Sequence, residues 1–103
     1  MVIYFNVPEA RKFLETKGFV YTVRRNRRSG ITMAREGSYF KFREIGKVLV
    51  VHVRTVDRLS DLYQFAGGSG FDSKDQWLSA IRKMHTTNRE LYYVELLKND
   101  EQA

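Results

Sequence analysis

The residues of this sequence with the clearest chemical use are four arginines within five positions. Arg24, Arg25, Arg27 and Arg28 surround a single asparagine, and Ser29-Gly30 closes the segment. Four guanidinium groups this close together repel one another, so the segment is costly unless something negative lies against it. We therefore predict that the arginines contact phosphate groups. A solvated basic loop without a ligand is the alternative.

A predicted β-strand positions the arginines. Between Phe19 and Arg24 nearly every residue is β-branched or aromatic, which is typical of a strand. A rigid strand that ends at the cluster can hold it towards a ligand. Within this strand we assign Tyr21 to the core.

The charge of the chain is concentrated in one region. The 103 residues carry a net charge of +6, but residues 11–43 hold ten Lys and Arg against only Glu15 and Glu36, so the remainder is slightly acidic. Such asymmetry favours a polyanionic partner, because neutralising phosphates releases counterions. A membrane surface is the competing polyanion. No predicted helix combines a basic face with a large apolar one, so we expect nucleic acid.

A second segment suited to nucleic acid follows at residues 39–43. The alternation places Phe40 and Phe42 on a core face and Tyr39, Lys41 and Arg43 on the other. On that outer face Tyr39 can stack on a base while Lys41 and Arg43 extend the line of phosphate contacts. A merely solvated outer face is the alternative.

The remaining pattern predicts an α+β fold in the order β-α-β-β-β-β-α-β. Asn6 and Glu9 resemble a capping box before a first helix that stops at Gly18. Ile45-Gly46-Lys47 predicts a turn between strands at 39–43 and 48–56. Residues 57–65 predict a short helix or irregular segment, and a second helix begins after Ser73. Two helices cannot cover both faces of a flat six-stranded sheet, so we predict a small mixed β-barrel.

One domain accounts for residues 1–98, and residues 99–103 are predicted to be a frayed tail. Its core is predicted to unite one face of the strand at 48–56 with the apolar stripe of the second helix. The residues of this predicted core are Leu49, Val51, Val53, Trp77 and Ile81.

Several classes of site are excluded by composition. The chain has no cysteine, so it has no disulfide, thiolate metal site or cysteine nucleophile. His52 has no second ligand at metal spacing, so we interpret it as a structural or surface residue and expect no metal and no cofactor. The N-terminus lacks the pattern of a signal peptide, and no apolar run is long enough to span a bilayer. We expect a cytoplasmic protein with no membrane partner.

The order of elements and a few short motifs resemble the ASCH domain, a branch of the PUA-like superfamily. The motifs are a strand ending in T-x-R, a loop reading SGF-S and a closing YYVEL strand, and the resemblance spans residues 2–97. Gly18, Thr22 and Arg24 correspond to the family pattern G-x-K-x-x-[ET]-x-R, with one residue fewer between the glycine and the arginine. The pattern's lysine has no clear counterpart, since Lys17 precedes the glycine and Val20 is apolar.

This resemblance implies a small β-barrel associated with RNA and a cleft lined by Thr22 and by Ser69 of the loop at 67–71. It also implies a second possibility, because some ASCH-like proteins resemble acetylcytidine amidohydrolases in which a lysine, a threonine and a glutamate cooperate. The loop from Ala66 to Phe71 holds no carboxylate. We therefore predict a non-enzymatic module that binds nucleic acid, RNA in particular. A nucleoside-processing hydrolase and a module that binds an acidic protein are the alternatives.

Overall fold

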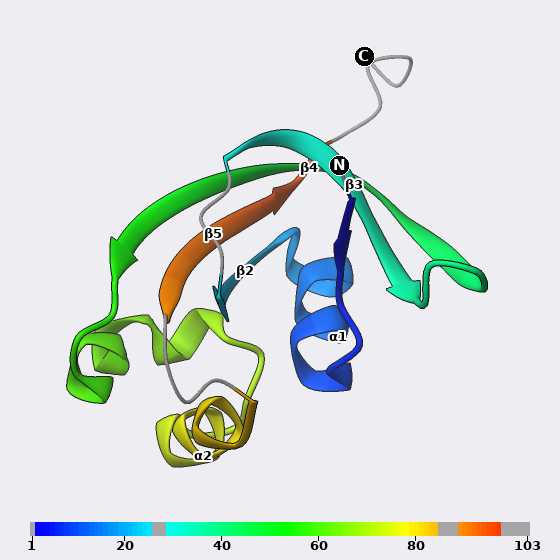
Figure 1. Ribbon diagram of the computed structural model, residues 1–103. Coiled ribbons are helices and arrows are strands. Elements are labelled where there is room, and N and C mark those ends of the chain that lie inside the picture. The colour runs from blue at the N-terminus through cyan, green and yellow to red at the C-terminus, as the bar shows by residue number, and fades with distance from the viewer. Residues whose placement is uncertain (1, 26–28, 85–88, 98–103) are drawn as a thin grey trace.

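The computed structural model describes residues 2–25, 29–84 and 89–97, and its described part is an α+β fold built on one curled sheet (Figure 1). Arg27, Arg28 and the predicted tail at 99–103 lie outside the described residues. In chain order the elements are β1 (Val2–Tyr4), α1 (Pro8–Lys17), β2 (Phe19–Arg24), β3 (Gly30–Gly37), β4 (Phe42–Thr55), the 3₁₀-helix η1 (Leu59–Gly68), α2 (Lys74–Met84) and β5 (Glu90–Leu96).

The sheet has five strands in the order β1-β3-β4-β5-β2. β1 runs parallel to β3, and the other neighbours are antiparallel. Strands β1 and β2 therefore form the two edges of the described sheet, which is not closed into a barrel. The sheet curls around α1, while η1 and α2 lie beneath its other end (Figure 1).

Two predicted strands are in fact one. The turn predicted at Ile45-Gly46-Lys47 lies inside β4, whose ladder with β3 continues on both sides of it. Ala34 pairs with Gly46 and the next residue pairs with Glu44, so Ile45 is an extra residue that forms a bulge. Gly46 has a φ of 150°, which a glycine adopts without strain. The chain bends here without reversing.

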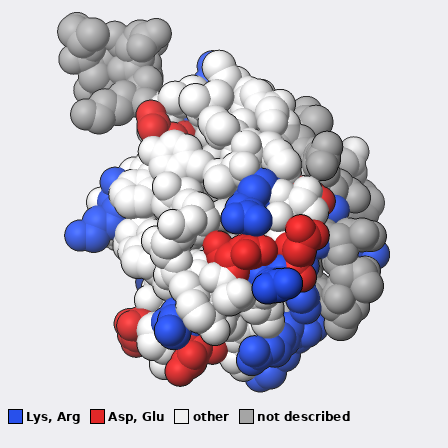
Figure 2. Space-filling view, turned by 90° about the vertical axis from the view of Figure 1, so that its left-hand side faces the viewer, with Lys and Arg blue, Asp and Glu red and all other residues white. Residues whose placement is uncertain are grey.

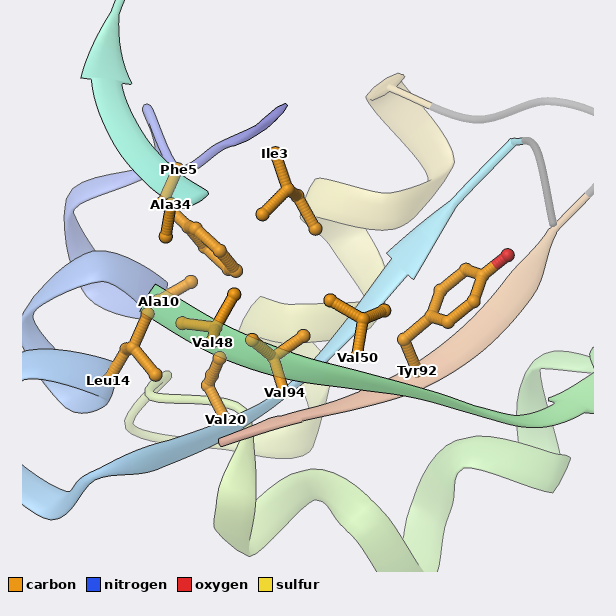
Figure 3. Close-up of a cluster of buried hydrophobic side chains, with 10 residues drawn as sticks. All are labelled: Ile3, Phe5, Ala10, Leu14, Val20, Ala34, Val48, Val50, Tyr92 and Val94. Carbon is orange, nitrogen blue, oxygen red and sulfur yellow. The ribbon is translucent and has the colours of Figure 1, made fainter. Parts of the chain in front are cut away.

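The buried face of β4 is the opposite of the predicted one. Val48 and Val50 are almost completely buried, whereas Val51 is 41% and Val53 38% exposed. Val48 and Val50 pack with residues of β1, α1 and the other strands in the cluster shown in Figure 3. Because side chains alternate along a strand, covering one face of β4 leaves the other face outside.

A second cluster joins the sheet to η1 and α2. Trp77 and Ile81 are buried as predicted, but they pack with Leu62 and Leu91 and not with the valines of β4. The described residues thus form two buried clusters where the sequence predicted one core. The division follows the sheet, because neighbouring β5 residues point to opposite faces and Leu91 and Tyr92 fall in different clusters.

The prediction that Phe40 and Phe42 face the core is also wrong. Phe40 is 93% exposed and Phe42 is 42% exposed. Phe40 belongs to the turn between β3 and β4, in which the Ser38 amide donates to the Lys41 carbonyl at 2.8 Å. Of the strand predicted at residues 39–43, residues 39–41 therefore belong to the turn, and only Phe42 and Arg43 lie in β4.

Candidate functional site

A cavity with polar groups in its wall lies where the two edge strands approach each other. Its volume is about 220 Å³. A smaller cavity of about 30 Å³ shares part of its wall and extends towards Trp77 and Phe71. We call the two together the cleft. The larger cavity is lined by Tyr4, Phe5, Asn6, Val7, Ala10, Thr22, Val23, Arg24 and Met84.

Strand β2 supplies the two polar side chains that the family resemblance emphasised. Thr22 and Arg24 are two positions apart, so both point to the same face of the sheet, and both line the cleft. Thr22 is only 9% exposed. The Arg24 guanidinium carbon lies 4.8 Å from the centre of the Phe5 ring, a cation–π distance. Arg24 therefore spans the gap between β2 and the residue that follows β1.

Beside Arg24, on strand β5, lies a buried carboxylate that was not predicted from the sequence. Glu90 is directly opposite Arg24 in the β2–β5 register and is 8% exposed. Its Oε1 accepts a hydrogen bond from the Thr55 hydroxyl at 2.8 Å and lies 2.7 Å from His52 Nε2. A buried carboxylate with such partners is held in one orientation. The only signal in the sequence is an acidic residue at the start of an apolar strand.

His52 therefore has a partner within the fold, the Glu90 carboxylate, which supports a structural role for this histidine. Its ring packs edge-on against Tyr92 with 5.4 Å between ring centres. Among the described residues, no group of three or more His, Cys, Asp or Glu side chains is arranged to hold a metal ion.

The basic residues predicted to form one track are divided by the fold. Arg25 is exposed at the end of β2, close in sequence to the start of β3 at Gly30. Lys41 and Arg43 lie at the other end of β3, beyond Gly37. The structure thus presents two separate basic regions among the described residues.

Arg43 is also engaged in ion pairs. Its Nη2 lies 2.5 Å from Glu15 Oε1 and 3.0 Å from Glu36 Oε1. The hydrogen bond to Glu15, followed by that to Glu36, raises the pKa of the Arg43 guanidinium. Arg11 pairs with Glu36 at 3.0 Å, so two arginines and two glutamates form a balanced network. The two glutamates therefore offset the charge of Arg43, although its side chain is exposed.

Ser69 does not present its hydroxyl to the cleft. The residue is completely buried. Its hydroxyl donates to the Ala66 carbonyl at 2.7 Å and lies 3.3 Å from the Phe71 amide, which donates to it. These bonds shape the turn after η1. Of the two residues expected to line the cleft, Thr22 lies in its wall and Ser69 supports the neighbouring loop.

The charge on the side of the molecule that carries the second half of β4 and η1 is mixed. Figure 2 shows acidic and basic side chains interspersed there, beside a large uncharged area. Arg54 on β4 pairs with Asp61 on η1 at 3.5 Å. The basic excess of the chain does not form a single continuous surface on this side.

None of the helices that the structure describes has the length and apolar character needed to cross a membrane. The chain was also compared with protein families, curated proteins and solved structures, and none of the three comparisons found a match.

Proposed function

We propose that this protein is a small nucleic-acid-binding module that takes a single strand, RNA in particular, into the cleft. The observation that carries the proposal is the position of Arg24 at the cleft. A cation suited to phosphate packs on the buried ring of Phe5, with the ring of Tyr4 and the hydroxyl of Thr22 in the same cavity wall. Unpaired bases are bound by this combination of stacking, edge hydrogen bonds and phosphate contacts.

The dimensions of the cleft favour an unpaired strand. Pockets for drug-sized ligands are typically about 300–1,000 Å³, and the larger cavity here is about 220 Å³. Such a space suits one base or nucleoside. A duplex keeps its bases stacked inside and would not enter it. In this proposal Arg25, Arg27 and Arg28 contact the phosphates that neighbour the bound base.

The proposal includes kinship with the ASCH domain and a PUA-like, barrel-related architecture. The matched motif positions Thr22 and Arg24 both line the cleft. Arg24 on one edge strand reaches Phe5 beside the other edge strand, which is consistent with a sheet curled towards closure. These points support the resemblance and do not depend on the identity of the bound nucleic acid.

The binding experiment is a fluorescence titration with single-stranded and duplex RNA and DNA at two salt concentrations. We expect single-stranded RNA to bind most tightly. Arg25→Ala should weaken binding to all sequences alike and reduce the magnitude of the log-affinity versus log-salt slope by about 0.7 for a single strand. Thermal stability should change little, because Arg25 is exposed.

Lys47→Ala is the matched control, because Lys47 is exposed and adjoins the buried Val48 on β4, so it points to the opposite face. It should leave both the affinity and the salt slope close to those of the unmodified protein. An Arg25 variant that behaves like the Lys47 variant would contradict a phosphate contact at Arg25. Failure of the unmodified protein to bind any of the four nucleic acids would overturn the proposed function.

A nucleoside-processing hydrolase is the second candidate, and Glu90 is the observation that favours it. The buried Glu90 carboxylate does not line the cleft, but it is opposite Arg24 on the neighbouring strand, whereas the loop at 66–71 has no carboxylate. A carboxylate and a hydroxyl are two of the three groups that the amidohydrolase chemistry of the resembled family uses. The lysine has no counterpart, so we rank this candidate below binding.

An assay on acetylated cytidine distinguishes the two candidates. We expect no turnover by the purified protein, and an unchanged fold with no change in activity for Thr22→Ala. Product formation can be followed chromatographically. Robust hydrolysis that is lost in both Thr22→Ala and Glu90→Gln would instead establish the hydrolase and assign its catalytic groups.

A further inference from the structure

The turn between β3 and β4 exposes two aromatic rings to an unusual degree. We call residues Ser38–Lys41 the hairpin tip. Tyr39 is 77% and Phe40 93% exposed, more than any other large hydrophobic side chain that the structure describes. Their ring centres are 5.1 Å apart with the planes at 84°. The two rings therefore lean on each other edge to face and leave most of their surface to solvent.

The backbone that carries these rings is held in one conformation. Ser38 N donates to the Lys41 carbonyl, and the Ser38 hydroxyl lies 3.3 Å from the Lys41 amide. Gly37 has a φ of +119°, and a β-carbon there would lie 2.4 Å from the Lys41 carbonyl oxygen. Only glycine fits this position without displacing the turn. The backbone of the tip is thus tightly closed, so binding a partner costs little backbone entropy there.

Asn6 connects the hairpin tip to the cleft. Its side-chain amide donates to the Gly37 carbonyl at 2.8 Å, and its side-chain oxygen accepts from the Gly37 amide at 2.6 Å. Asn6 also lines the larger cavity of the cleft. One residue therefore belongs to the wall of the cleft and to the base of the tip, and the two surfaces are neighbours although Asn6 and Gly37 are 31 positions apart.

We infer that the hairpin tip is a second contact for the same single strand, where Tyr39 and Phe40 stack on bases that flank the one in the cleft. This inference rests on the proposed function. Exposed Lys41 lies next to the rings and can meet a phosphate, whereas the balanced network of Arg11, Glu15, Glu36 and Arg43 adds no net charge. Aromatic rings stack on any base, since every base has a π-face.

A strand long enough to reach both surfaces should show the contact, and a short one should not. The test compares RNA of about 3 nucleotides with unstructured RNA of about 10 nucleotides, within the range of site sizes known for single-strand binders. The double substitution Tyr39→Ala/Phe40→Ala should weaken binding of the longer RNA by about 5- to 150-fold for each stacked base lost. Binding of the short RNA should stay within about twofold of the unmodified protein, as expected when no aromatic stack is lost.

Two further variants serve as controls. Tyr63→Ala removes another exposed tyrosine beside a cation, since the Lys74 ammonium lies 4.1 Å from its ring centre, and it should leave both affinities unchanged. The conservative double variant Tyr39→Phe/Phe40→Tyr keeps both rings and should retain binding of the longer RNA.

The outcomes separate this inference from the proposed function. No loss for either RNA overturns the hairpin tip as a second contact and leaves binding in the cleft intact. Equal loss for short and long RNA also overturns the inference, because a second contact should affect only the longer strand. Binding of neither RNA by the unmodified protein overturns both. Attachment to anionic lipid vesicles through Tyr39 and Phe40, without a length-dependent effect on RNA, assigns the tip to a membrane surface and also overturns the inference.

Discussion

Replacement of Trp77 by alanine should lower the free energy of unfolding by about 3–5 kcal/mol, which is the usual cost of removing a buried tryptophan. Trp77 is 3% exposed and packs with side chains of β2, η1 and β5, so its loss leaves a cavity at the junction of three elements. Domains of this size are stable by only about 5–15 kcal/mol. The variant should therefore be close to unfolding at moderate temperature.

Urea unfolding followed by circular dichroism measures this effect, because Trp77 is the only tryptophan and its removal abolishes the natural fluorescence probe. Met84→Ala is a suitable control on the same helix, since Met84 is 51% exposed. It should cost well under 1 kcal/mol, roughly the limit for ordinary surface substitutions. If Trp77→Ala lowered the free energy of unfolding as little as Met84→Ala, the second cluster would contribute little to stability.

Replacement of Arg24 by alanine should have the largest effect on binding of any single arginine described by the structure. Arg24 lines the cleft and packs on Phe5, so it is held in place before a ligand arrives. Hydrogen bonds to charged groups contribute about 1.5–3 kcal/mol, which corresponds to a loss of about 10- to 150-fold in affinity. The loss should be larger than that of Arg25→Ala, whose side chain is exposed.

Arg24→Ala should also reduce stability, unlike Arg25→Ala. It removes the contact with Phe5, for which about 0.5–2 kcal/mol is typical, and it leaves the buried Glu90 without the cation opposite it. Arg24→Lys keeps the charge but loses the planar guanidinium, so an intermediate affinity is expected. Titration and thermal unfolding of the three variants measure both effects. Equal affinities for Arg24→Ala and Arg25→Ala would contradict a special position for Arg24.

Local features of the chain could be predicted from the sequence because their causes are local. The first helix ends at Gly18, which adopts the left-handed conformation and donates to the Leu14 carbonyl. The strand Phe19–Arg24 follows from β-branched and aromatic residues, and the burial of Trp77 follows from a helical stripe. Helical periodicity and glycine conformation depend on residues a few positions apart, so sequence alone determined these elements and the α+β class.

The face of β4 that is buried could not be predicted in this way. Residues Val48 to Val51 are apolar at every position, so alternation carries no signal about which face turns inwards. The tertiary structure decides it, because β1 and α1 cover the side of Val48 and Val50. Phe40 was misassigned for a related reason, since the same apolar alternation fits a strand and an exposed turn.

The candidate site was only partly predictable. Thr22 and Arg24 lie on one strand two positions apart, so the sequence alone placed them on a common face. The other parts of the site depend on contacts between distant residues. Glu90 meets His52 across 38 positions, and Asn6 meets Gly37 across 31. Asn6 was expected to cap the first helix, but Val7 is the residue at the cap, and the Asn6 amide instead pairs with the β3 backbone. Only the folded sheet, by curling its two edges towards each other, decides which of several possible partners these polar groups find.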